Sequence, residues 1–228
     1  MKTAFVLQHV PFEGPGRLGP SLRSRGYDVR VLPVFESSEW PELRTADLVV
    51  VMGGPMSVDD EASHPWLEPE KRAVREAIDS GVPTLGVCLG SQIIASCLGA
   101  AVRPHHEREV GWYPVHAVRD ESLAKALAEP SRVLHWHGDR WELPTGARLL
   151  VASEGCDHQA FAIDDHVLGV QYHLEMEPDG VKELIHHCPE DLAPGPWVDT
   201  VDQLLDTRSC FDAAHKALEA VLEEWIPE

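Results

Sequence analysis

The chain has 228 residues, of which 43% are hydrophobic, so it is long enough for one domain with a full core, or for one domain with a small appendage. Its formal net charge is −19, from 38 acidic and 19 basic residues, and no basic stripe interrupts the acidic composition. Such a surface repels phosphate backbones, so we expect no nucleic-acid partner.

The cysteines and the apolar runs indicate the compartment. The five cysteines are odd in number and irregular in spacing, which argues against a disulfide framework and against a zinc ribbon. The N-terminus lacks the long apolar run of a signal peptide, and no apolar segment approaches the length of a membrane span. We therefore expect a cytoplasmic protein with no membrane partner.

The first hundred residues alternate between strand and helix patterns. A continuous apolar run at residues 47–52 is typical of a central parallel strand, and Gly26 and Gly81 are suited to ending helices. The alternation predicts an α/β fold with a doubly wound, mostly parallel sheet. The expected strands are residues 3–8, 27–32, 47–52 and 82–87, and the expected helices are residues 17–25, 68–80 and 89–99.

The middle of the chain is richer in strands joined by short turns. We expect these strands to extend the sheet with antiparallel partners and to return residue 173 to the neighbourhood of Cys88. The expected strands are residues 100–103, 112–118, 133–136, 149–153, 159–163 and 167–172, with one helix at 122–128.

We divide the chain into a domain at residues 1–188, closed by a helix at 178–187, and a C-terminal helical extension at 189–228. The extension is expected to carry helices at 198–205 and 210–225, with Ser209 and Asp212 in the manner of a capping box. The last helix has one apolar face that this domain or a second chain must cover. That face comprises Phe211, Ala214, Leu218, Val221, Leu222 and Trp225.

A cysteine lies between the expected strand at 82–87 and the helix that follows it. Gly86 and Gly90 stand two residues before and two residues after Cys88. Small neighbours suit a side chain at a sharp strand-to-helix turn, and the N-terminus of the new helix favours a thiolate. The sequence therefore predicts a nucleophilic cysteine, although this stretch alone also fits a buried structural cysteine.

A second stretch supplies partners for that cysteine. A buried strand ends in His173, and Glu175 follows two residues on, so the two side chains share a face if the strand continues. A cysteine nucleophile needs a base, and the base needs an acceptor that orients it. Cys88, His173 and Glu175 are therefore predicted to form a catalytic triad.

With these residues in place, the sequence resembles the class I glutamine amidotransferases, the Cys-His-Glu family. Three motifs carry the resemblance over roughly residues 1 to 185, and it is closest to stand-alone proteins similar to the amidotransferase part of GMP synthase. The resemblance implies a flavodoxin-like amidotransferase fold. The motifs are Gly53-Gly54-Pro55-Met56-Ser57, Gly86-Val87-Cys88-Leu89-Gly90-Ser91-Gln92 and Gly169-Val170-Gln171-Tyr172-His173-Leu174-Glu175.

The resemblance also implies roles for residues around the triad. Gly54 and Leu89 are implied to give the backbone N–H groups of an oxyanion hole, which would stabilise the negative charge formed on attack at an amide. Gln92, one helical turn past Cys88, is implied to hold the α-amino and α-carboxylate groups of glutamine. The segment similar to the family's His-Gly-Asp segment is implied to contact the same groups through its backbone. That segment comprises Trp136, His137, Gly138 and Asp139.

The expected reaction is hydrolysis of the γ-amide of glutamine through a Cys88 thioester, with glutamate and ammonia as products and a synthetase as a conceivable partner. No cofactor is expected. No metal is expected either, because neighbouring histidines such as His105 and His106 point apart on a strand or helix. Two alternatives stay open: a stand-alone γ-glutamyl hydrolase, peptidase or transferase acting on a small γ-glutamyl compound, and an inactive binding or regulatory module.

Overall fold

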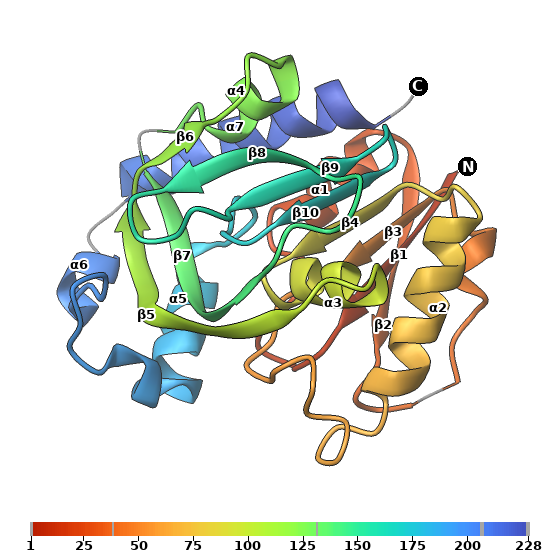
Figure 1. The fold of residues 1–228 in the computed structure, drawn as a ribbon, viewed down its shortest axis with the longest axis horizontal. Coiled ribbons are helices and arrows are strands. Elements are labelled where there is room, and N and C mark those ends of the chain that lie inside the picture. The colour runs from red at the N-terminus through yellow and green to blue at the C-terminus, as the bar shows by residue number, and fades with distance from the viewer. Residues whose placement is uncertain (1, 38, 131, 206–207, 227–228) are drawn as a thin grey trace.

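A computed structural model describes residues 2–37, 39–130, 132–205 and 208–226. Its centre is an eight-stranded sheet in the order β2-β1-β3-β4-β10-β9-β8-β6 (Figure 1). The first five strands of this order are parallel, and the last three join by antiparallel pairing. The strands are β1 (Lys2–Gln8), β2 (Tyr27–Pro33), β3 (Leu48–Val51), β4 (Thr84–Val87), β6 (Val115–Ala117), β8 (Arg148–Ser153), β9 (Ala160–Ile163) and β10 (Val167–Val170).

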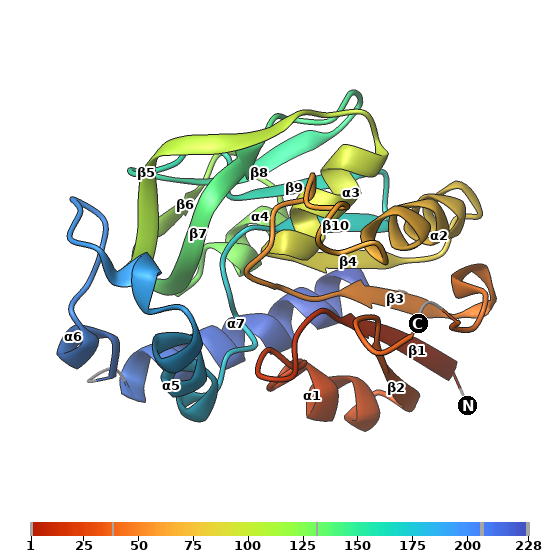
Figure 2. The ribbon, with the colours of Figure 1, turned by 90° about the horizontal axis from the view of Figure 1, so that it is seen from below.

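Helices cover both faces of this sheet (Figure 2). Along β1, Ala4 and Val6 pack on one side, whereas Phe5 and Leu7 pack on the other, as the two-residue period of a strand requires. The doubly wound, mostly parallel α/β fold with an antiparallel extension is therefore confirmed. One face carries α1 (Leu18–Ser24), α4 (Ser122–Leu127) and α7 (Arg208–Trp225), and the other carries α2 (Leu67–Asp79) and α3 (Leu89–Cys97), with the short 3-10 turn η1 (Leu43–Thr45) beside α2.

Two strands do not extend the sheet as the sequence analysis predicted. β5 (Val102–Tyr113) and β7 (Val133–Trp141) form a separate antiparallel ribbon, with a shift in register between Pro104 and Glu109. Both are longer than expected, because residues 104–109 of β5 and residues 137–140 of β7 are largely polar and so gave no apolar strand pattern. The ribbon runs beside α3 and reaches the C-terminal helices (Figures 1 and 2).

The residues after 188 pack against those before it. α5 (Pro178–His187), the 3-10 turn η2 (Pro189–Leu192), α6 (Val201–Leu205) and the start of α7 enclose the apolar side of the ribbon. The rest of α7 joins the main core with Leu218, Leu222 and Trp225. Ser209 lies inside α7, whose described residues run from Arg208 to Trp225, so the prediction that Ser209 caps this helix is wrong. Within the described residues, no helix is both long and apolar enough to cross a membrane.

Candidate active site

Cys88 occupies the sharp turn between β4 and α3. Its φ of 51° and ψ of −111° lie in a region that side chains rarely adopt, and its N–H donates to Val170 O at 2.8 Å. A Cβ on Gly86 would lie 2.5 Å from the backbone of Gly90, and a Cβ on Gly90 would overlap the carbonyl of Val51. The turn therefore needs both glycines, and it fixes the sulfur at the carboxyl edge of the sheet.

His173 and Glu175 meet in a bend and not along a continued strand, which corrects that part of the prediction. β10 ends at Val170, and His173 N–H donates to Leu134 O at 2.8 Å. Beyond that anchor, His173 Nδ1 lies 2.7 Å from Glu175 Oε1, and both side chains are buried. Burial alone would lower the pKa of His173, but the charges and hydrogen bonds of Glu175 and Cys88 raise that pKa well above its usual value. The imidazole is therefore a strong base.

The sulfur of Cys88 lies between the base and the ribbon. Sγ is 3.5 Å from Trp136 O, within hydrogen-bonding reach of a thiol. Burial raises the pKa of the Cys88 thiol, while the hydrogen bond and charge of His173 and the N–H of Leu89 act in the opposite direction. Burial thus favours the thiol form of Cys88, and Glu175 would stabilise a proton passed from the sulfur to His173.

The loop after β3 lies at the same site as the sulfur of Cys88, and the buried His9–Glu70 pair anchors its backbone. His9 Nδ1 lies 2.9 Å from Gly53 O, and His9 Nε2 lies 2.8 Å from Glu70 Oε1. Burial lowers the pKa of His9, but Glu70, the Gly53 carbonyl and Glu13 together raise it, and the pKa stands above its usual value. A protonated ring donates to both partners, so His9 fixes the backbone on which Gly54 stands. His9 and Glu70 belong to none of the motifs found in the sequence.

A cavity of about 290 Å³ opens at Cys88 and gathers most of the predicted site residues. Gln92 reaches it from α3, with Nε2 3.4 Å from Asp139 O and 3.3 Å from Gln171 Oε1. His173 and Glu175 stand behind the sulfur and do not line the cavity, and Leu89 contributes its N–H beside the sulfur. The predicted residues in the wall are Gly54, Cys88, Gln92, Trp136, His137, Gly138 and Asp139.

The sequence model of the glutamine amidotransferase class-I family matches residues 17–186. The chain belongs to this family. It is 33% identical over 200 residues to a putative glutamine amidotransferase-like protein of Salmonella typhimurium, covering 85% of this chain and 83% of that protein. It is 33% identical over 154 residues to a glutamine-hydrolysing GMP synthase subunit of Saccharolobus solfataricus, covering 67% of this chain and 78% of the relative.

Two solved glutamine amidotransferases share the fold of this family member over its whole length. The crystal structure from Methylobacillus flagellatus is 29% identical with a TM-score of 0.89, covering 99% of this chain and 94% of the other. The structure from Thermotoga maritima is 29% identical with a TM-score of 0.86, covering 100% of this chain and 99% of the other. These amidotransferases thus match the C-terminal helices as well, although the family model stops at residue 186.

Several residues of this amidotransferase cavity were missed by the sequence analysis. Glu13, Asp60, Arg108 and Asp191 line the cavity. Burial raises the pKa of the Glu13 carboxyl, the charge of His173 lowers it, and Glu175 raises it. Glu13 stands in the loop after β1, at the carboxyl edge where ligands of parallel sheets bind, so its position in the chain was a usable signal.

Proposed function

We propose that the protein hydrolyses the γ-amide of glutamine through a thioester on Cys88. The observation that carries this proposal is a cysteine on a strained turn, at the mouth of a cavity, next to an imidazole held at 2.7 Å by a buried carboxylate. Membership of the class I glutamine amidotransferase family supports the same reaction class.

The first half of the reaction forms the thioester. Cys88 gives its proton to His173, and the sulfur attacks the γ-carbonyl carbon of glutamine. The carbonyl oxygen becomes an oxyanion, which the N–H groups of Gly54 and Leu89 stabilise. When the tetrahedral intermediate collapses, the carbon–nitrogen bond breaks, and His173 returns the proton to the leaving ammonia.

The second half releases glutamate. His173 takes a proton from water, and the resulting hydroxide attacks the thioester carbon. The carbon–sulfur bond breaks, Cys88 recovers the proton from His173, and the product carboxyl forms. Glu175 holds the ring in one orientation and stabilises its cation in both halves.

The cavity fits a small substrate. At about 290 Å³ it lies at the lower end of the roughly 300–1,000 Å³ range of small-molecule sites. Gln92 and the backbone of residues 136–139 would hold the α-amino and α-carboxylate groups, since they line the same cavity as Gly54 and Cys88. This arrangement needs no cofactor for the amide chemistry.

The test is glutamate release from glutamine by Cys88→Ala and by Cys97→Ala. Cys97 is the matched control, because burial raises the pKa of its thiol to about 12 and its sulfur contacts Lys71 O at 3.2 Å. We expect Cys88→Ala to lose hydrolysis and reaction with a glutamine-like electrophile, and Cys97→Ala to keep both. Wild-type rates in Cys88→Ala would refute the mechanism.

A second candidate is hydrolysis or transfer of a small γ-glutamyl amide other than glutamine. The cavity continues from Cys88 to Leu184 and Cys188 near the end of α5 and to Asp191 in η2, which leaves room for a leaving group larger than ammonia. A comparison of kcat/KM for glutamine and for γ-glutamyl methylamide and ethylamide separates the candidates. A higher kcat/KM for either alkyl amide than for glutamine favours the second candidate. If the protein hydrolyses none of the three compounds, a binding or regulatory module is the remaining interpretation.

The relatives named as glutamine-hydrolysing GMP synthase subunits support a synthetase partner that would receive the ammonia. The assay measures glutamine hydrolysis with and without the partner and its substrates, and we expect the partner to stimulate it.

All five cysteines are free thiols in the structure, which supports the proposal that the protein works in the reducing cytoplasm.

A further inference from the structure

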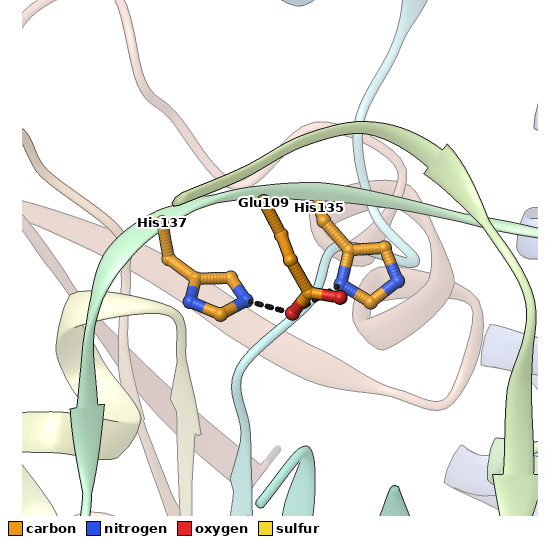
Figure 3. A group of neighbouring side chains, drawn as sticks. All are labelled: Glu109, His135 and His137. Carbon is orange, nitrogen blue, oxygen red and sulfur yellow. Dashed lines mark ion pairs between the residues drawn. The ribbon is translucent and has the colours of Figure 1, made fainter. Parts of the chain in front are cut away.

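Three buried side chains with metal-binding atoms gather on one face of the β5–β7 ribbon. Glu109 lies directly across from His137 in the register, and Gly111 lies across from His135. Because side chains alternate along a strand, His135 and His137 project to the same side as Glu109. All three are buried, and Figure 3 shows both rings turned toward the carboxylate.

The ligand atoms of this cluster share one small space. His137 Nε2 lies 3.0 Å from Glu109 Oε2, His135 Nδ1 lies 3.7 Å from the same oxygen, and all three side chains offer atoms within 4.8 Å of one another. His137 Nε2 nevertheless has no hydrogen-bond partner. Both imidazole rings therefore lie beside the carboxylate, and the ligand atoms of all three side chains surround one small space.

The contacts of the imidazole nitrogens show which of these atoms face the cluster. His137 Nδ1 lies 3.1 Å from Asp139 O, so its N–H is donated there and the lone pair of Nε2 faces Glu109. His135 Nδ1 lies 3.4 Å from the Gln159 amide, so this ring nitrogen also faces the cluster. Two ring nitrogens and a carboxylate oxygen converge, which is an arrangement that a cation stabilises.

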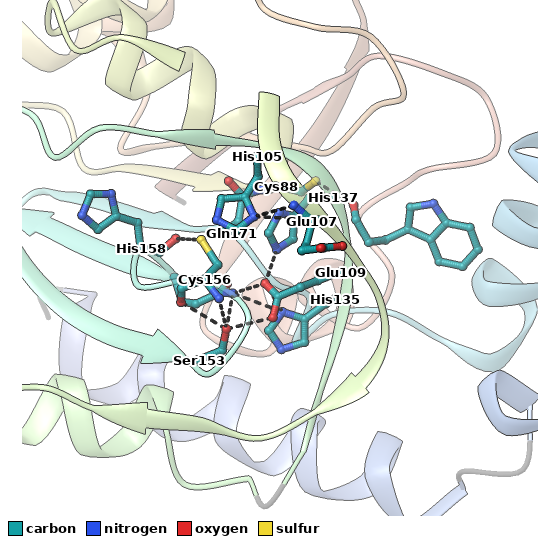
Figure 4. A network of polar contacts seen from close by, with 12 residues as sticks. Cys88, His105, Glu107, Glu109, His135, His137, Ser153, Cys156, His158 and Gln171 are labelled. Atoms are coloured by element: carbon teal, nitrogen blue, oxygen red, sulfur yellow. Dashed lines mark hydrogen bonds and ion pairs between the residues drawn. The ribbon is translucent and has the colours of Figure 1, made fainter. Parts of the chain in front are cut away.

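In the part of the chain that the structure describes, the Glu109 carboxylate is not paired with a fixed cation. The Ser153 hydroxyl donates to it at 2.8 Å (Figure 4). Among the described residues, no lysine or arginine forms an ion pair with Glu109, and the adjacent Arg108 pairs with Asp191.

We propose that Glu109, His135 and His137 bind a divalent first-row transition metal ion such as Zn²⁺. Two histidines and a carboxylate are a known ligand set for this ion, and ligands about 2.0–2.1 Å from a tetrahedral ion stand roughly 3.3 Å apart, between the two separations found here. The supporting contacts also fit, because His137 donates its other N–H to a carbonyl and Glu109 accepts from Ser153.

Gln159 completes the site when its amide turns over. Its nitrogen now donates to Glu109 Oε2 at 2.7 Å, and its oxygen is buried without a partner. A half-turn of the amide exchanges these atoms and presents the oxygen as a fourth ligand. His137 also lines the active-site cavity, which gives the ion a path from solvent. The bound ion would fix residues 136–139, the wall of that cavity.

The experiment measures metal binding in the Cys88→Ala protein, so that the reactive thiol cannot serve as a ligand. After chelator treatment, the protein is titrated with Zn²⁺ and with Co²⁺, and metal content, visible Co²⁺ absorption and unfolding temperature are recorded. We expect one ion per chain, absorption bands of a tetrahedral or five-coordinate Co²⁺ site, and a higher unfolding temperature with Zn²⁺.

Three variants in the same background locate the site. Glu109→Gln and His135→Gln should weaken Co²⁺ binding tenfold or more. His105→Gln should leave Co²⁺ binding unchanged. This variant is the control, because the His105 and His106 rings lie 4.2 Å apart and are the alternative place where histidines could bind the ion. Absence of one-to-one binding in the parent would overturn the proposal without any variant, and so would loss of the Co²⁺ bands in His105→Gln alone.

Discussion

The backbone strain at Cys88 predicts an unusual order of stability between two inactive variants. Cys88→Ala and Cys88→Gly both remove the sulfur and its contacts, so their difference reports on the backbone at φ 51° and ψ −111°. At an ordinary position, glycine is less stable than alanine by about 0.5–1 kcal/mol, because it loses more conformational freedom on folding. At Cys88, we expect Cys88→Gly to be the more stable protein.

The magnitude follows from the strain that glycine relieves. A non-glycine residue in a sparsely populated region costs on the order of 1–3 kcal/mol. After the entropic cost of glycine is subtracted, Cys88→Gly should exceed Cys88→Ala by about 1 kcal/mol, which corresponds to about 2–4 °C in unfolding temperature for a chain of this size.

The assay is thermal unfolding followed by circular dichroism, with Ala73→Gly in α2 as the control for glycine in regular backbone. That control should unfold at a lower temperature than the parent by the ordinary glycine cost. If Cys88→Gly falls below Cys88→Ala by the same amount as the control falls below its parent, the turn at Cys88 stores no strain and the reasoning is wrong.

Three further predictions concern the base, the buried His9 pair and α7. His173→Asn should lower kcat/KM for glutamine roughly a hundredfold or more, and Glu175→Gln should lower it less, because the second change leaves the base itself in place; the reverse order would contradict the assigned roles. The raised pKa of His9, held there by Glu70 against burial and helped by Glu13, means that the folded protein keeps a proton that the unfolded chain releases near pH 6.5. The free energy of unfolding should therefore fall as pH rises from about 6.5 through the raised pKa, and it should do so less in His9→Asn. A chain cut after residue 188 should not fold as a monomer, because it loses the buried side chains of Leu218, Val221, Leu222 and Trp225. Burial of each contributes roughly 1.5–3 kcal/mol, and the sum is comparable to the roughly 5–15 kcal/mol by which a whole domain is stable. A cooperative unfolding transition of a monomeric fragment would disprove this prediction.

The sequence predicted well where a local pattern is tied to one structure. The apolar run at β3 is buried on both faces of the sheet, so its pattern indicated a central parallel strand. Gly26 and Gly81 follow α1 and α2 with φ of 84° and 76°, which is the conformation that glycine adopts at helix ends. The same local logic placed Cys88 on its turn, because Gly86 and Gly90 have no room for a side chain.

Local patterns failed where partners come from distant parts of the chain. The polar residues 104–109 of β5 showed no strand signal, and of these only Pro104 and Glu109 pair with β7. Glu13 gave no motif, and its place beside His173 depends on how the loop after β1 folds across the sheet edge. The metal expectation considered neighbouring histidines, whereas the cluster found here joins alternate residues of β7 to a glutamate on the opposite strand.

The sequence by itself determined the alternating core, the glycine-flanked nucleophile and the order of the three family motifs, because each depends on periodicity or on steric limits within a few residues. Only the tertiary structure decided that His173 meets Glu175 in a bend anchored on Leu134, and that Glu109 faces His135 and His137. These contacts depend on the register of strands far apart in the chain, and register is set by the summed packing of a whole sheet or ribbon and not by any one stretch.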